Sequence, residues 1–277
     1  IDTVVRGDEL FSSQQAGTQR ALLPETAVAK VAAVPGVAVA EGSIQTVQLT
    51  LLDAAGEPMG GFGPPTIVGT WNFDPKMASY QVDQGRAPAA DDEIIIDRAA
   101  VKKGKFTVGK KVVLIGAKGR ETFTLVGTSR FGSADSAGGA TYVGTTLATS
   151  QRLAGELGKV DTIAVRADAG VTPAQLVDRI SKAEVDPKAD VVTGAQAAAE
   201  QASDIKDAFG FFRTALLVFA FISLFVGWFI ISNTFSILVA QRTRELALMR
   251  AIGASRRQVL TSVVVEVART MPIDDIV

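Results

Sequence analysis

The chain has 277 residues, a formal net charge of −1, and neither cysteine nor histidine. Without cysteine there is no disulfide framework or thiolate nucleophile, and without histidine the usual proton shuttle of neutral pH is missing. Zinc would have to be held by carboxylates alone, a ligand set that zinc sites do not favour. The composition therefore excludes most familiar hydrolytic mechanisms, and a charge near zero gives no general reason to expect a nucleic acid partner.

The start of the chain predicts short elements. Residues 1–20 are polar, so we expect them to be extended or weakly ordered. A short helix is predicted from Pro24 to about Ala33, and Pro35-Gly36 ends it. Residues 37–52 alternate loosely between apolar and polar side chains, which indicates one or two strands.

The middle of the chain predicts mainly strands, at 93–97, 111–115 and 122–127. The turn at residues 116–119 joins the last two strands as a hairpin. A helix is expected at 146–157, closed by Gly158, and a further strand is expected at 161–167.

Two capping boxes mark the helix starts that follow. Thr172-Pro-Ala-Gln175 and Thr193-Gly-Ala-Gln196 each place a hydroxyl and a side-chain amide where they can satisfy the free backbone groups of a helix start. A short strand is expected between them at 190–192, and the second helix continues through Asp207. We therefore expect a continuous or nearly continuous helix leading out of this domain.

Strand–helix–strand patterns occupy residues 22–52 and 160–193. Together they predict an α+β domain over residues 1–205, built from two such units with a mostly β insertion at about 55–145. The domain is followed by α-helical membrane segments.

An uncharged stretch of roughly 27 residues runs from Thr214 to Ala240. At about 1.5 Å per residue it exceeds the roughly 30 Å hydrocarbon core of a bilayer. We assign 206–240 to a stalk and transmembrane helix, in which Ser232, Asn233 and Thr234 mark a packing face. Clustered arginines directly after the span mark its cytoplasmic end, so residues 1–205 are expected to be extracytoplasmic.

The segment 241–258 predicts a helix, a tight corner and a second helix. Residues 241–252 favour a helix, Gly253 is a natural helix stop, and Ser255-Arg-Arg-Gln258 is a third capping box. From the residue pattern alone, this segment either lies on anionic headgroups or docks a cytoplasmic protein. Glu245, the specified corner and an apolar stripe favour docking.

Both ends of the chain indicate further membrane segments. Residues 259–268 begin an apolar helix that is too short to span a bilayer, so 259–277 is expected to be truncated or joined across a gap. The polar start has no signal peptide, so an earlier span is expected to precede Ile1.

The segment QRTRELALMRAIGASRRQVL resembles the signature of FtsX-like permeases of ATP-binding cassette transporters, which include macrolide-exporter and lipoprotein-releasing permeases. Residues 31–40 and 85–114 resemble the periplasmic core domain of that family more loosely. The resemblance implies that the segment is a coupling helix seated in a groove of the ATPase. The residues at the family's recurrent positions, and so the expected docking residues, are Arg244, Glu245, Leu246, Met249, Arg250, Gly253 and Ala254.

What the resemblance implies is a permease subunit of the bacterial cytoplasmic membrane, not an enzyme. It implies no catalytic, cofactor or metal site on this chain, because ATP and magnesium are bound by a partner ATPase. The expected assembly is a homodimer or a pairing with a second permease half, and the expected role is export or extraction of an apolar molecule or lipoprotein. The alternatives are a regulator of an extracellular protein, such as a cell-wall hydrolase, that transports nothing, and a single-span receptor.

Two patterns resemble ligand sites but favour simpler structures. Residues 104–111 come within one residue of a phosphate-binding loop, but Lys111 stands where Ser or Thr would hold magnesium. The flanking residues predict a turn leading into a strand. Asp91, Asp92 and Glu93 are adjacent acids before a strand, which are more often a solvated turn than a metal site.

Overall fold

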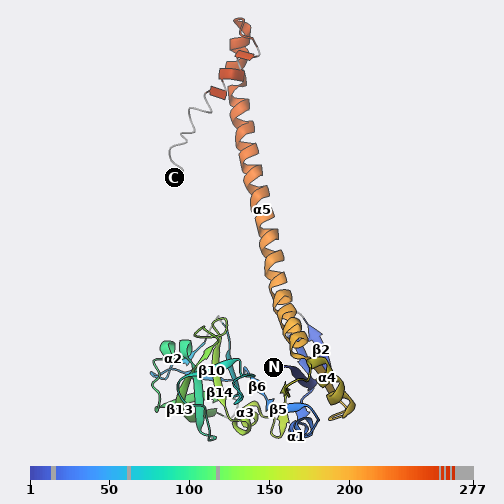
Figure 1. The fold of residues 1–277 in the computed structure, drawn as a ribbon. Helices are drawn as coiled ribbons and strands as arrows, with labels where there is room; N and C mark the ends of the chain where they lie inside the picture. The colour runs from blue at the N-terminus through green and yellow to red at the C-terminus, as the bar shows by residue number, and fades with distance from the viewer. Residues whose placement is uncertain are drawn as a thin grey trace. The chain divides into compact units, whose positions relative to one another are not determined.

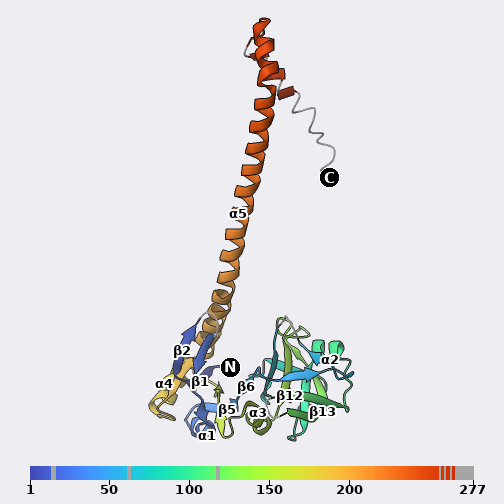
Figure 2. The ribbon, with the colours of Figure 1, turned by 180° about the vertical axis from the view of Figure 1, so that it is seen from behind.

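The computed structural model describes residues 1–13, 17–60, 64–116, 119–255, 257–258, 260–262 and 264–265. The chain divides into two compact units, Ile1–Ala208 and Phe209–Val277. The first unit contains two lobes with separate sheets, which lie side by side in both ribbon views (Figures 1 and 2).

The first lobe is an antiparallel sheet covered on one face by two helices. Among the described residues the sheet has four strands in the order β17-β1-β16-β5. The strands are β1 (Thr3–Gly7), β5 (Val37–Ser43), β16 (Thr162–Ala167) and β17 (Ala189–Thr193), and the helices are α1 (Thr26–Ala32) and α4 (Pro173–Lys182). Fully buried side chains of both helices and of the central strands form its core, including Val5, Val31, Ile163, Leu176 and Ile180.

The described residues of the segment 1–20 are extended, as one of the two expectations had it, but they are not weakly ordered, because they form paired strands. Strand β1 lies between β16 and β17, and Val5 pairs with Ile163 on one side and Val191 on the other. Strands β2 (Glu9–Ser13) and β3 (Gly17–Arg20) then form an antiparallel pair. The polar composition was misleading because the partners that bury β1 lie more than 150 residues further along the chain.

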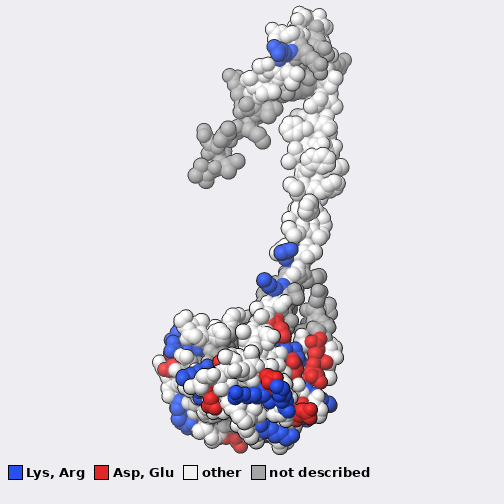
Figure 3. Space-filling model, turned by 45° about the vertical axis from the view of Figure 1, so that its right-hand side comes forward, with Lys and Arg blue, Asp and Glu red and all other residues white. Residues whose placement is uncertain are grey.

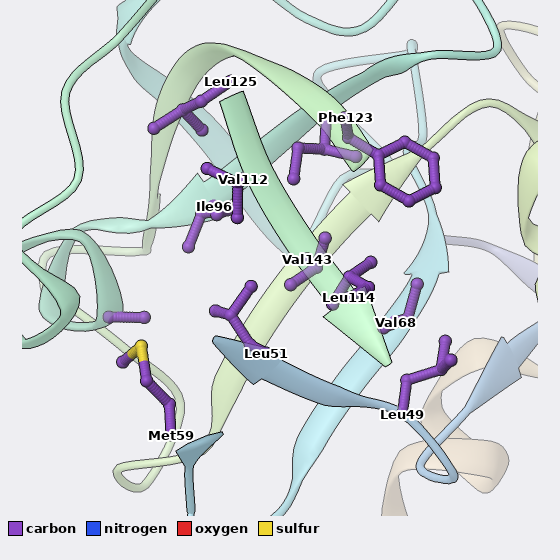
Figure 4. Close-up of a cluster of buried hydrophobic side chains, with 12 residues drawn as sticks. Leu49, Leu51, Met59, Val68, Ile96, Val112, Leu114, Phe123, Leu125 and Val143 are labelled. Carbon is purple, nitrogen blue, oxygen red and sulfur yellow. The ribbon is translucent and has the colours of Figure 1, made fainter. Parts of the chain in front are cut away.

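The second lobe is a mixed sheet. Within the described ranges its nine strands follow the order β6-β9-β14-β11-β13-β12-β7-β8, with β10 also pairing with β13. The strands are β6 (Gln45–Thr46), β7 (Thr50–Leu52), β8 (Pro58–Met59), β9 (Thr66–Thr70), β10 (Tyr80–Gly85), β11 (Glu93–Asp97), β12 (Lys111–Gly116), β13 (Gly119–Phe131) and β14 (Thr141–Thr145). Figure 4 shows its core, in which Ile96, Val112, Leu114, Phe123 and Leu125 pack together.

The predicted hairpin of the second lobe is present as β12 and β13, paired antiparallel from Lys111↔Thr124 to Gly116↔Gly119. The sequence did not indicate helix α2 (Arg98–Gly104), which precedes β12. Its N-cap is the fully buried Asp97, whose carboxylate accepts a hydrogen bond from the Ala100 N–H. A helix before the glycines and a strand after them is the reverse of a phosphate-binding loop.

Helix α3 (Leu147–Ala154) joins the two lobes. Its first residue, Leu147, packs against the core of the first lobe, while Leu153 packs against the core of the second. The helix is shorter than expected because Gly155, with φ of 76°, ends it before Gly158 is reached. Two short strands, β4 (Leu23–Pro24) and β15 (Lys159–Val160), pair next to it.

Helix α5 (Gly194–Ala251) begins in the first unit and ends in the second. Its predicted capping box is present, because the Gln196 N–H donates to Thr193 Oγ1 at 3.2 Å and the Thr193 N–H donates to Gln196 Oε1 at 3.0 Å. The helix crosses both proposed limits, after residues 205 and 240, without a break. Those domain limits therefore stay predictions, whereas the α+β class of the outer domain is confirmed.

Candidate functional site

Helix α5 contains one long apolar stretch. An 18-residue window within Arg213–Ala240 has a mean hydropathy of 2.5, and within the described residues this is the only helix long and apolar enough to cross a membrane. Figure 3 shows the stretch without acidic or basic side chains between its ends. Length and composition therefore fit the predicted span.

The hydroxyl groups of this stretch bond within the helix. Thr234 Oγ1 donates to the Ile230 carbonyl and Ser236 Oγ donates to the Ser232 carbonyl, both at 2.8 Å. Such i−4 bonds satisfy a hydroxyl in an apolar surrounding without a neighbouring helix. The packing face predicted at Ser232, Asn233 and Thr234 stays a prediction, and the hydroxyl of Thr234 does not require it.

Helix α5 ends at a glycine corner. Gly253 has φ of 101°, in the left-handed region that side chains rarely adopt. The Ala254 N–H reaches back to the Met249 carbonyl at 3.0 Å, and the Ile252 N–H donates to the Leu248 carbonyl at 3.2 Å. These bonds close the last turn of the helix and turn the chain away from its axis.

A second helical turn begins directly after the corner. The Ser255 N–H donates to Gln258 Oε1 at 2.9 Å, and the Gln258 N–H donates to Ser255 Oγ at 3.4 Å. These are the reciprocal bonds of a capping box, so the third predicted box is confirmed. The sequence therefore specifies both sides of the corner by local chemistry.

The structure places the predicted docking residues on the last turns of α5 and in the corner. The backbone of Arg244, Glu245, Leu246, Met249 and Arg250 is helical. Of their side chains only that of Met249 belongs to the described part of the structure, and it is 36% exposed. The docking roles of these residues and of Gly253 and Ala254 stay predictions.

Two apolar side chains at the end of α5 are strongly exposed. Leu248 is 70% exposed and Ile252 is 81% exposed, and they lie four residues apart on neighbouring turns. Exposed apolar side chains next to a fixed corner are suited to filling a groove on a partner protein.

The start of α5 is tied to the first lobe by ion pairs. Arg6 on β1 contacts Asp190 on β17 at 3.0 Å and Glu200 on α5 at 2.5 Å. Arg20 on β3 lies 3.4 Å from the same Asp190 and 3.6 Å from Glu200. These residues line one wall of a polar cavity of about 1250 Å³, and no sequence motif indicated them.

Two of the three adjacent acids at the start of β11 have separate partners. Glu93 pairs with Arg86, and the hydrogen bond from that guanidinium lowers the pKa of Glu93 to about 2. Asp91 accepts a hydrogen bond from Thr146 Oγ1 at 2.9 Å. Among the residues that the structure describes, no group of acidic side chains is arranged to hold a metal ion.

Two further carboxylates connect the lobes and were missed from the sequence. Asp161 accepts a bond from the Gln45 N–H at 2.8 Å, and burial raises the pKa of Asp161 to about 6. Asp74 accepts a bond from Arg166 Nε at 2.7 Å. Neither residue belongs to a local motif, because each bonds to a residue about 90 or more positions away in the chain.

Family models match most of the chain. A model of the MacB-like periplasmic core domain matches residues 2–183, which is more than half of the chain. A model of the FtsX-like permease C-terminal region matches residues 217–271, which include the apolar stretch and the glycine corner. A comparison with curated proteins gives no match.

One solved structure supports the family match at the level of the fold, and a second is reported for comparison. The periplasmic region of MacB from Actinobacillus actinomycetemcomitans is similar with a TM-score of 0.52 at 10% identity, covering 72% of this chain and 91% of that chain. The extracellular domain of the ABC-type transporter YknZ from Gram-positive bacteria has a TM-score of 0.48 at 12% identity, covering 69% of this chain and 100% of that chain.

The two matched regions follow one another in the chain as an α+β domain and a helix that contains the apolar stretch and ends in a capped corner. Their order and extent agree with the resemblance found in the sequence. The chain therefore belongs to the family of FtsX-like permeases with a MacB-like periplasmic core domain, membrane-embedded components of ATP-binding cassette transporters.

Proposed function

We propose that this chain is the permease subunit through which a separate ATPase moves an extracytoplasmic domain. The ATPase binds the end of α5 on the cytoplasmic side, and the first unit lies on the outside of the bacterial cytoplasmic membrane. The work done there is the export or extraction of an apolar molecule or a lipoprotein. ATP and magnesium are bound by the partner, and this chain supplies no catalytic residue.

The observation that carries the proposal is the corner at Gly253. A positive φ, the backward bond from Ala254 and the capping box at Ser255 fix the path of the chain directly after an apolar stretch long enough to span a bilayer. A segment that only lies on headgroups needs basic and apolar faces but no specified corner. A docking element needs a fixed shape, since ordering it on binding would cost affinity.

Movement at the corner reaches the outer domain along a single helix. Helix α5 runs from Gly194 to Ala251, and its first turns are tied to the first lobe through Glu200. The permease must have at least two conformations. A change of state in the ATPase shifts the balance between them only if the ATPase binds one conformation more tightly than the other. We assign these differential contacts to Arg244, Glu245, Leu246, Met249, Arg250, Gly253 and Ala254.

The first test uses the full-length protein with a candidate ATPase, reconstituted in lipid nanodiscs. Glu245→Lys should abolish stimulation of the ATPase, because it reverses a charge in the docking helix. Glu57→Lys is the matched control, since Glu57 lies on the exposed surface of the second lobe. Equal stimulation of the Glu245→Lys variant and the wild type would contradict the docking role.

Export and regulation are separated by a cellular measurement. Cells that lack the protein should accumulate an envelope lipoprotein or apolar compound in the cytoplasmic membrane if the protein exports or extracts it. A regulator of a cell-wall hydrolase predicts instead a defect of cell shape with export unchanged. Failure of any ATPase to copurify under gentle detergent conditions would contradict both.

A further inference from the structure

The two segments of chain that cross between the lobes are hydrogen-bonded to one another at Asp161. The chain passes from the first lobe to the second at Ser43–Gln45 and returns before β16. Asp161, at the return, donates its N–H to the Ser43 carbonyl at 2.9 Å and accepts from the Gln45 N–H at 2.8 Å. Both crossings are therefore held together by a single residue.

A loop of the second lobe makes another attachment at a distance from that point. Residues 72–79, here called the strap, leave β9 at Trp71 and return at β10. Within the strap, Asp74 accepts from Arg166 Nε on β16 at 2.7 Å, and the Asp74 N–H donates to Glu41 Oε1 on β5 at 3.0 Å. Asp161 and Arg166 are five residues apart along the chain, about 16 Å along a strand.

The strap contact is more than a loose surface pair. The side chain of Asp74 is 11% exposed and that of Arg166 is 30% exposed. Asp74 also accepts from the Lys76 N–H at 2.8 Å, which orients its carboxylate toward β16. The N–H of Lys76 and, next in size, the guanidinium of Arg166 lower the pKa of Asp74, so its carboxylate is ionised at neutral pH.

Two attachments separated along a strand restrict rotation that a single attachment allows. We propose that the strap, latched by Asp74 to Arg166 and Glu41, is a lock that fixes the angle between the two lobes. Opening it would let the second lobe rotate about the crossing segments at Asp161. The proposal rests on contacts inside the first unit and does not depend on the proposed function.

The competing explanation is that helix α3 alone fixes the lobes, since its residues enter both cores. The two explanations differ in what happens when the strap is released. If α3 is sufficient, loss of the Asp74–Arg166 pair leaves the angle between the lobes unchanged. If the strap is the lock, loss of either partner frees it.

The test measures the distance between the lobes in the full-length protein. Because the sequence has no cysteine, Ala29→Cys on α1 and Lys103→Cys on α2 create the only two thiols for spin labels, both at exposed positions. Labelled protein is diluted with unlabelled protein in nanodiscs, and the spin–spin distance distribution is recorded. We expect one narrow distribution for the protein with the native strap.

Asp74→Asn and Arg166→Gln should each add a second distance population or broaden the distribution beyond the width of the label itself. Asn at position 74 still accepts the bond from Lys76, so the turn is kept while the charge is lost. Glu93→Gln is the matched control, because it removes an ion pair that lies within the second lobe. Unchanged distributions in both strap variants would overturn the lock and leave α3 as the joint.

Exchange of the two charges separates a lock from local unfolding. The double variant Asp74→Arg with Arg166→Asp keeps an ion pair between the strap and β16, and the arginine at position 74 also suits Glu41. We expect it to restore the narrow distribution. Broadening in both single variants without restoration in the double variant would also overturn the proposal.

Discussion

The carboxylate of Asp161 accepts a hydrogen bond from the backbone N–H of Gln45, 116 residues earlier in the chain, at 2.8 Å. Its other oxygen lies 3.5 Å from Ser43 Oγ. One partner is an N–H, which can only donate, and the other is a hydroxyl, which can either donate or accept. An amide in place of this carboxylate could therefore keep both bonds.

Asp161→Asn should remove a pH dependence of stability. Burial raises the pKa of Asp161 from 3.8 to about 6, so the folded protein binds a proton more readily than the unfolded chain. The free energy of unfolding therefore rises as the pH falls from about 7 to about 4, by up to about 3 kcal/mol from this group. The variant should lose that rise and be at least as stable as the wild type near neutral pH.

Urea unfolding of the detergent-solubilised protein measures this effect. Trp71 is buried and reports on the first unit, provided that Trp228, the other tryptophan, is replaced by phenylalanine. A variant with the same pH dependence as its parent would show that Asp161 is not the group that titrates.

Asp97→Asn should behave in the opposite way. The fully buried carboxylate of Asp97 accepts from two backbone N–H groups, those of Ala100 at 2.9 Å and Tyr142 at 2.7 Å. An amide oxygen can accept one of them, but the amide NH₂ then faces the other donor. We expect a loss of about 2 kcal/mol in the free energy of unfolding, because a buried donor loses its acceptor. Equal stability by urea unfolding would contradict this.

Val5→Ala tests the central position of β1. Val5 is fully buried in the core of the first lobe, so removing two methyl groups should destabilise the outer domain by about 2 kcal/mol. Val47→Ala is the control, because Val47 is 59% exposed and the same deletion there should change little. Similar losses in the two variants would mean that β1 is not a core strand.

Substitutions at Gly253 should follow the conformational preference of each residue. A side chain added there meets no atom within 4 Å, so the effect comes from its φ of 101° and not from crowding. Asparagine tolerates positive φ better than valine does, so Gly253→Asn should keep more ATPase stimulation than Gly253→Val. Gly210→Val is the control, since Gly210 is equally open but lies within α5. An equal loss at Gly210 would remove the special role of the corner.

Local chemistry accounts for what could be predicted from the sequence. All three capping boxes, starting at Thr172, Thr193 and Ser255, are present, because each joins residues three positions apart. The apolar stretch and the α+β class could also be predicted, because the length of an apolar run and the period of hydrophobic residues indicate the type of element.

What the sequence did not predict depends on distant partners. From the sequence alone, β1 is part of a polar terminal segment. Its role as a central strand depends on pairing with β16 and β17. Asp74 and Arg166 are 92 residues apart and belong to no motif, so only the fold brings them together. Asp97 looks like an ordinary end of a strand, and the short helix that it caps has no periodic pattern long enough to detect.

The pairing of β1 also imposes an order on folding. The second lobe uses a continuous part of the chain, from β6 at Gln45 to β14 at Thr145, so its contacts can form as soon as that part is available. The central strand of the first lobe pairs instead with Ala189–Thr193, close to the point where α5 begins. During synthesis the sheet of the first lobe is therefore incomplete until β17 has been made, and β1 lacks this partner in the meantime. Until β17 is available, one edge of β1 has no strand partner, and an unpaired edge can pair with other chains.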